Sequence, residues 1–234
     1  MNCMVGLVAA GFCMTLPLSA AIPDEPDFTK SPLKELGVEL VKPAKDEKTG
    51  FIVAGKNATA LIRKLPAING RKIAALEKDM RPGAKSEVSS KLGFLGMDES
   101  FLAILAEDND FVLDKLGLTH QELAKHLHIV GAIAEKHAKP GDAEGFVFQY
   151  LARRYNVKFI TYRGIMHSPF LDETKTNSVA DLTNLTTGAK VKYSRLVPHM
   201  IERYGFYEGH GTPYRVDPRA IVAVFDFLIE KKKQ

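Results

Sequence analysis

The sequence predicts an α+β fold, in which a helical middle region is followed by a small antiparallel sheet with closing helices. Apolar residues recur at helical spacing through much of residues 57–140. After Pro140 and Gly141 the pattern changes to short, β-rich segments. Asp217 and Pro218 then carry the opening signals of a last helix. Because helices and strands are segregated along the chain, we expect α+β rather than α/β.

Three segments before residue 117 are expected to be helical. Asn57 is the expected N-cap of a short helix that runs to Leu65. Residues 71–80 place apolar side chains on one helical face and stop before Pro82 and Gly83. Residues 98–116 form a third apolar segment, which the polar triplet 108–110 can divide into two helices.

The strongest helix signal in the chain follows. Thr119 and Glu122 form a capping box. In this motif the Thr119 side chain accepts from the backbone N–H of Glu122, and the Glu122 side chain accepts from the backbone N–H of Thr119. The helix is expected to continue to about Ala138. Its expected buried stripe comprises Leu123, Leu127, Val130, Ala134 and His137.

The last third is expected to mix short helices with strands. Gly205 is a suitable C-terminal residue for the helix that Pro198 opens, because glycine adopts positive φ without strain. In order, we expect a short helix over 143–154, a strand over 157–162, a polar loop over 164–177, a hairpin of 179–185 and 190–193, a helix over 198–205, and a final helix from 217.

Residues 1–21 have the pattern of a secretory signal peptide. No charged side chain precedes Asp24, the segment Val5–Leu18 is nearly all apolar, and small residues end at Ala21. We therefore expect a periplasmic or secreted protein that is cleaved near Ala21 and keeps no transmembrane span. An uncleaved N-terminal anchor stays open as the alternative. The expected division of the chain is 1–21 signal peptide, 22–56 extended arm and hairpin, 57–140 helical region and 141–234 α+β region.

The cysteine positions agree with this division. Cys3 and Cys13 both lie within the expected leader. A chain cleaved near Ala21 has no cysteine, so it forms no disulfide and uses no thiol chemistry.

Charge and histidine spacing disfavour two classes of function. The formal net charge is +4, and the basic residues are spread out rather than gathered on one face, so nucleic acid is disfavoured as a partner. His126 and His128 point to different sides of a helix. His126 and His137 are separated by roughly 16 Å at the helical rise, too far to chelate one ion. We predict no metal and no cofactor.

The segment Arg203–Asp217 is the expected functional site, because it gathers glycines, aromatic residues and ionisable residues between two helices. Glu208 and His210 are the candidate catalytic acid and base. The candidate ligand-binding residues are Arg203, Tyr207, Tyr214 and Arg215, which can stack on a ring or hold a carboxylate. The alternative is that this loop only fills the core.

A second set of candidates is a Ser-His-Asp arrangement of Ser168, Asp172 and either His199 or His210. No Gly-x-Ser-x-Gly turn surrounds Ser168, so the sequence gives this set little support.

Two functions from different classes follow. The favoured hypothesis is a non-catalytic extracytoplasmic protein that binds an unknown envelope or extracellular partner, or a small ligand. The alternative is a hydrolase of envelope or extracellular polymers that uses Glu208 and His210 as an acid–base pair.

Overall fold

The computed structural model describes residues 26–28, 33–84 and 90–230. Within these ranges the chain has seven α-helices and two antiparallel sheets, which confirms the predicted α+β class. None of the helices in these ranges is long and apolar enough to cross a membrane. The expected leader, with both cysteines, lies outside them.

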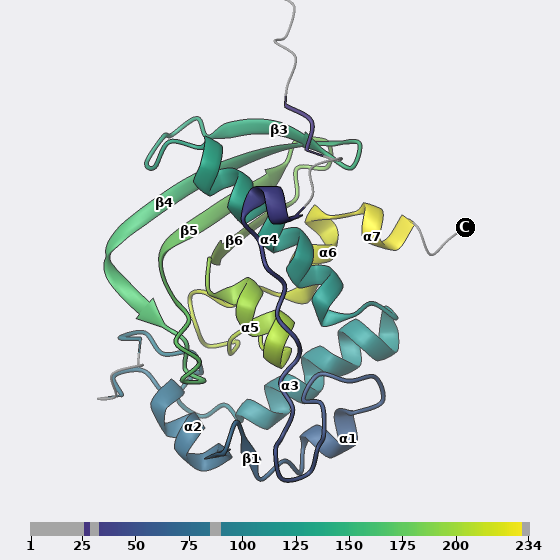
Figure 1. Ribbon diagram of the computed structural model, residues 1–234, viewed down its shortest axis with the longest axis vertical. Helices are drawn as coiled ribbons and strands as arrows, with labels where there is room; N and C mark the ends of the chain where they lie inside the picture. Colours follow the sequence, from purple (N-terminus) through teal and green to yellow (C-terminus); the bar gives the residue numbers. More distant parts are fainter. Residues whose placement is uncertain (1–25, 29–32, 85–89, 231–234) are drawn as a thin grey trace, which may run out of the picture.

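The helices of the first half gather at one end of the molecule, below the sheet in the view of Figure 1. Their elements are α1 (Thr59–Ile62), β1 (Ala67–Ile68), β2 (Arg71–Lys72), α2 (Ile73–Met80), α3 (Phe101–Asn109) and the π-helix η2 (Asp110–Lys115). The short 3-10 helix η1 (Leu33–Leu36) lies apart from them and packs against α4. The longest helix, α4 (His120–His137), runs from this end to the sheet.

The N-terminal region is less regular than expected. The expected hairpin is reduced to one antiparallel bridge, between Lys45 and Ile52. Asn57 does not cap a helix, because it adopts a left-handed φ of 58° and α1 begins only at Thr59.

The polar triplet 108–110 does not divide the helical segment as expected. The chain passes from α3 into η2 without leaving helical backbone angles, because Asp108 and Asn109 are buried with polar partners rather than turned to solvent. The cap of α3 is Ser100, whose hydroxyl accepts from the Ala103 N–H at 3.4 Å.

The capping box of α4 is confirmed. The Thr119 hydroxyl accepts from the Glu122 N–H at 3.1 Å, and Glu122 Oε2 accepts from the Thr119 N–H at 2.7 Å. Four members of the predicted stripe are buried, but His137 is exposed at the helix end and stacks on Phe146. His120, at the other end of α4, is fully buried.

The larger sheet has the order β3-β4-β5-β6, with all neighbours antiparallel. The helix predicted over 143–154 is wrong: residues 146–150 pair with 157–153 of β4 as a tight hairpin. The alternation of aromatic and smaller residues there suits a strand with one face buried, and this contact outweighs the helical spacing. The strands are β3 (Phe146–Tyr150), β4 (Arg153–His167), β5 (Lys175–Asn184) and β6 (Lys190–Ser194).

Helix α4 covers one face of this sheet (Figure 1). The buried Tyr193 of β6 donates its hydroxyl to the Leu127 carbonyl of α4 at 2.8 Å. Gly131 faces the guanidinium of Arg195, and a Cβ at this glycine would lie 1.7 Å from an Arg195 nitrogen. The glycine leaves room for this side chain to cross α4 on its way to Glu135, and a larger residue would displace the guanidinium.

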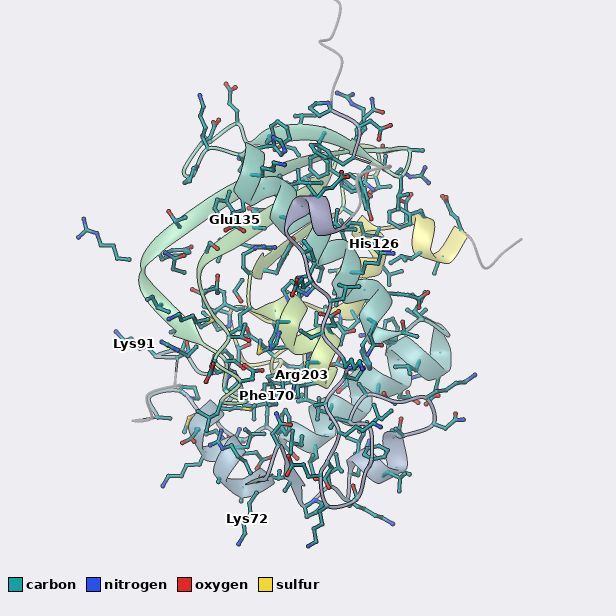
Figure 2. The ribbon with its side chains drawn as sticks, viewed as in Figure 1. Lys72, Lys91, His126, Glu135, Phe170 and Arg203 are labelled. Carbon is teal, nitrogen blue, oxygen red and sulfur yellow. The ribbon has the colours of Figure 1, made fainter. Side chains whose placement is uncertain are left out.

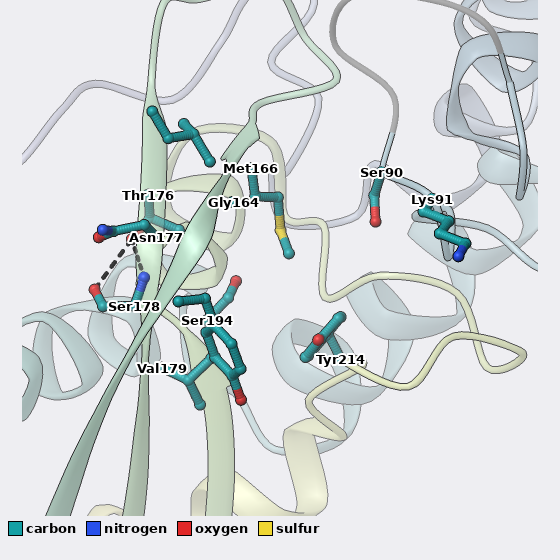
Figure 3. Close-up of a pocket in the computed structure, with 12 residues that line it drawn as sticks. Ser90, Lys91, Gly164, Met166, Thr176, Asn177, Ser178, Val179, Ser194 and Tyr214 are labelled. Carbon is teal, nitrogen blue, oxygen red and sulfur yellow. Dashed lines mark hydrogen bonds between the residues drawn. The ribbon is translucent and has the colours of Figure 1, made fainter. Parts of the chain in front are cut away.

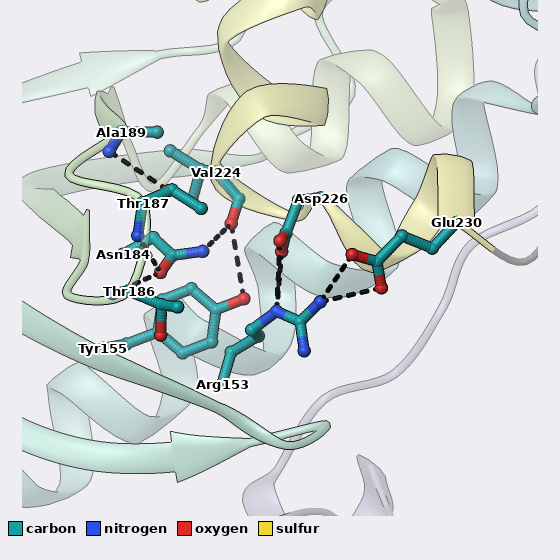
Figure 4. A network of polar contacts seen from close by, with 9 residues as sticks. All are labelled: Arg153, Tyr155, Asn184, Thr186, Thr187, Ala189, Val224, Asp226 and Glu230. Carbon is teal, nitrogen blue, oxygen red and sulfur yellow. Dashed lines mark hydrogen bonds and ion pairs between the residues drawn. The ribbon is translucent and has the colours of Figure 1, made fainter.

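A buried asparagine joins the sheet to the C-terminal helices α6 (Pro218–Val224) and α7 (Phe227–Glu230) (Figure 4). The Asn184 amide donates to the Val224 carbonyl at 2.9 Å, and its oxygen accepts the N–H groups of Thr186 and Thr187. Tyr155 donates its hydroxyl to the same Val224 carbonyl at 3.3 Å. One side chain thus holds both the β5–β6 turn and the end of α6.

We expect Asn184→Ala to lower the free energy of unfolding by about 2 kcal/mol, because it removes three hydrogen bonds at a fully buried site. Thr187→Ala is the matched control in the same turn, where the side chain is exposed and accepts one long bond from Ala189. Urea unfolding of both variants checks this. Equal losses for the two would contradict the role given to Asn184.

Candidate binding cleft

The predicted site loop leaves α5 (Val197–Tyr204) at Gly205, as the sequence predicted. Gly205 has a φ of 67°, and a Cβ here would lie 2.8 Å from the Ala54 side chain, so both backbone angle and space require glycine. The next residues, 206–209, are buried, whereas His210 and Gly211 are exposed. Most of the loop therefore passes through the interior of the protein.

A buried ion pair anchors this loop to α3. Arg215 contacts Asp108 through two bonds, Nη2 to Oδ1 at 2.7 Å and Nη1 to Oδ2 at 3.1 Å. The side chains are only 8% and 4% exposed. Arg215 Nη1 also donates to the Glu208 carbonyl. Burial raises the pKa of Asp108 to about 6, which leaves the carboxylate ionised beside the guanidinium at neutral pH.

Tyr207 belongs to a second buried contact, between the loop and α4. Its hydroxyl lies 2.8 Å from His120 Nδ1, and His120 Nε2 lies 3.3 Å from Asn109 Oδ1. Because Oδ1 only accepts, Nε2 carries the hydrogen and Nδ1 accepts from Tyr207. Burial lowers the pKa of His120 to about 3, so the ring is neutral. The Tyr207 hydroxyl is thus held inside the fold.

Glu208 and His210, the candidate acid–base pair, lie in different environments. Glu208 is fully buried with a φ of 68°, and its Oε2 accepts from the Thr212 hydroxyl at 3.2 Å. Burial raises its pKa to about 8, so it is protonated at neutral pH. His210 is exposed and pairs with Glu107 at 3.2 Å. In the described part of the chain, Glu208 and His210 bond different partners, Thr212 and Glu107, and not each other.

The Ser-His-Asp set is brought together, but in the wrong order for a catalytic triad. Asp172 Oδ2 lies 2.7 Å from His199 Nε2 and accepts from the Tyr204 hydroxyl at 2.8 Å. Burial by itself raises the pKa of Asp172, but hydrogen bonds from His199, Tyr204 and Ser168 lower it well below its usual range. The carboxylate, rather than the imidazole, is central, and Ser168 is buried.

The contacts of Asp172 with His199 and Tyr204 fix the loop between β4 and β5 onto α5. Phe170, from the same loop, stacks on Tyr204 with a centroid distance of 3.6 Å. Arg203 also belongs here: its Nε donates to the Tyr204 hydroxyl at 3.1 Å. Figure 2 shows Phe170 and Arg203 together beside α5. The candidate ligand residue Arg203 therefore supports the fold at this point.

A cleft opens where β4 and β5 lose their register. Thr161 pairs with Ser178 and Met166 with Thr176, so residues 162–165 of β4 stand opposite Asn177 alone. All of Thr161–Ile165 is exposed. The resulting β4–β5 cleft has a volume of about 360 Å³. Residues of β4, β5 and β6 form one side, and Ser90, Lys91 and Tyr214 lie across from them (Figure 3).

Tyr214 is the one predicted site residue that lines this cleft. Its neighbour Arg215 is tied to Asp108, and the Val216 N–H donates to the Tyr207 carbonyl at 3.1 Å. The buried part of the loop thus positions the half-buried tyrosine. The sequence reading missed the other side of the cleft, because it took 164–177 as a polar loop. The exposure of the apolar pair Tyr162 and Ile165, which marks this side of the cleft, is visible only in the structure.

Comparisons with protein-family models, curated proteins and solved structures found no match to this chain. In the described ranges, no group of three or more His, Cys, Asp or Glu side chains is placed to hold a metal ion. The β4–β5 cleft is lined by both polar and apolar side chains and has the size of a small-ligand site.

Burial of Glu208 gives a pH dependence of stability with a definite sign. Its pKa is raised on folding, so the unfolding free energy falls as pH rises from the unfolded value to about 8. The pKa of His120 is lowered on folding, so its contribution makes the unfolding free energy rise with pH, and this contribution is complete above pH 6.5. We therefore expect the free energy of unfolding to fall by at most about 2 kcal/mol between pH 6.5 and 8.

Glu208→Gln should abolish this fall, whereas Glu107→Gln, at a nearby exposed carboxylate, should keep it. Urea unfolding at half-unit pH steps measures the effect. Parallel pH curves for the wild type and Glu208→Gln would contradict it.

Proposed function

We propose that this chain is a non-catalytic extracytoplasmic binding protein that holds its ligand in the β4–β5 cleft. The observation that carries the proposal is the cleft itself, in which Tyr214 from the predicted site loop faces the irregular part of β4 and β5. Its volume of about 360 Å³ lies at the lower end of the range for small-molecule sites.

The surroundings of the cleft support binding rather than chemistry. Most ionisable side chains of the loop are already occupied: Arg215 with Asp108, Tyr207 with His120, and Glu208 inside the core as a neutral acid. They hold the loop in one conformation, and a preorganised site binds with a smaller entropy cost. The hydrolase alternative, which needs Glu208 and His210 to reach one substrate, stays a prediction.

The extracytoplasmic part of the proposal rests on the sequence of residues 1–21. The rest of the chain contains no cysteine and needs no reducing environment. The ligand or partner is accordingly one met in the envelope or outside the cell.

The cleft is tested by filling it. Gly164 lines it, and a Cβ at this position meets nothing within 4 Å, so a side chain can start here and Gly164→Phe adds bulk at the cleft. Thr161→Phe is the matched control, an exposed position on the same strand outside the cleft. A small-molecule thermal-shift screen should find compounds that raise the melting temperature of the wild type and Thr161→Phe but not of Gly164→Phe.

Compounds that stabilise all three proteins equally would show that the cleft is not the site. The same would follow if a screen of extracts and libraries found no stabilising compound for the wild type.

Export is tested by fractionation and N-terminal sequencing of the chain expressed in a bacterial host. We expect the protein in the periplasm or medium, with an N-terminus close to Ile22. A cytosolic protein with Met1–Ala21 intact would refute this part of the proposal and leave the cleft unaffected. A membrane-bound protein with this segment intact would support the anchor alternative.

A further inference from the structure

We infer that the β4–β5 cleft takes an amphipathic monocarboxylate, meaning a single carboxylate attached to an aromatic or branched apolar body. This inference rests on the proposed binding function and specifies its ligand. Three features of the cleft lining carry it: its charge, one hydrogen-bond donor without a partner, and its apolar surface.

The charge of the lining is positive. Among the described residues that line the cleft, Lys91 is the one charged side chain, and no carboxylate is present. Its backbone is held by the Gly83 N–H, which donates to the Lys91 carbonyl at 3.2 Å. The ammonium on its flexible four-carbon stem can then move over the opening. One cation suits a monoanion better than a doubly charged phosphate.

A buried hydroxyl in the lining has no partner. Ser194, at the end of β6, is 1% exposed, and its Oγ has no hydrogen-bond partner among the described residues. Its neighbours across the sheet are satisfied, since the Thr176 and Ser178 hydroxyls lie 3.2 Å apart (Figure 3). Buried hydroxyls are normally paired, because an unpaired one costs about 1–3 kcal/mol. A ligand oxygen that enters the cleft and displaces the atoms covering this hydroxyl would accept its hydrogen bond.

The remaining lining is apolar and uncovered. Tyr162 is 46% exposed and Ile165 is 59% exposed, although both are large hydrophobic residues. Met166 and Tyr214 complete this surface. An aromatic or branched body would cover these side chains while its carboxylate meets Lys91 and Ser194. The cleft volume of about 360 Å³ limits that body to a small molecule or the terminal residue of a peptide.

The test compares N-acetyl-L-phenylalanine with its amide, which has the same body and no charge. Titrations of the full chain are followed by NMR chemical shifts. We expect the acid to bind at least about tenfold more tightly, which corresponds to about 1.4 kcal/mol. Lys91→Gln should lower the affinity for the acid to that for the amide, and it should leave the affinity for the amide unchanged. Lys91→Arg should retain most of the preference.

Ser194→Ala separates a ligand contact from a structural role. Because its hydroxyl has no partner within the described part of the chain, the variant should unfold at the same or a higher denaturant concentration, yet bind the acid several-fold more weakly. Loss of stability with unchanged binding would overturn the assignment. A parallel titration with 3-phenylpropionate identifies the source: equal binding indicates a free acid, and preference for the acetylated amino acid indicates a peptide C-terminus.

Equal affinity for the acid and the amide would overturn the inference, as would failure of both acids to bind at about 10 mM, where even a weak site is occupied. Neither result would remove the proposed function, which the Gly164→Phe screen decides separately.

Discussion

The structure of the site depends on the buried ion pair between Arg215 and Asp108. Two charges removed from water stabilise a fold only when their geometry is good, and here the guanidinium meets the carboxylate through two bonds. The same guanidinium bonds the Glu208 carbonyl, so one side chain fixes a loop that has no regular structure of its own. Tyr214 is placed at the cleft because its neighbour Arg215 is bonded to Asp108 and to the Glu208 carbonyl.

A second polar centre fixes the opposite side. The carboxylate of Asp172 accepts from Tyr204 and contacts His199, which ties the β4–β5 loop to α5. Between these two anchors, β4 and β5 depart from regular pairing and leave Tyr162 and Ile165 uncovered. The two anchors use their polar groups internally, whereas the irregular part of β4 leaves apolar side chains exposed.

Local signals in the sequence identified several elements correctly. The capping box at Thr119, the end of α5 at Gly205 and the cap of α6 at Asp217 all involve neighbours within a few residues. The wrong predictions fell at positions where contacts with residues far away in the sequence decide the secondary structure. Residues 146–150, expected to be helical, form a strand because β4 pairs with them. Asp108 and Asn109 stayed inside a continuous helix because Arg215, His120 and Thr59 meet them there.

The sequence by itself determined the α+β class and the helix ends on either side of the segment 203–217, because periodicity, caps and glycines act over short distances. Only the tertiary structure decided the role of each side chain. Tyr207, Glu208 and Arg215 carry the polar groups expected of a site, but partners from α3 and α4 and the loop's own Thr212 occupy them. Tyr214 faces the cleft, whose other side comes from strands that lie at least about 20 residues away along the chain.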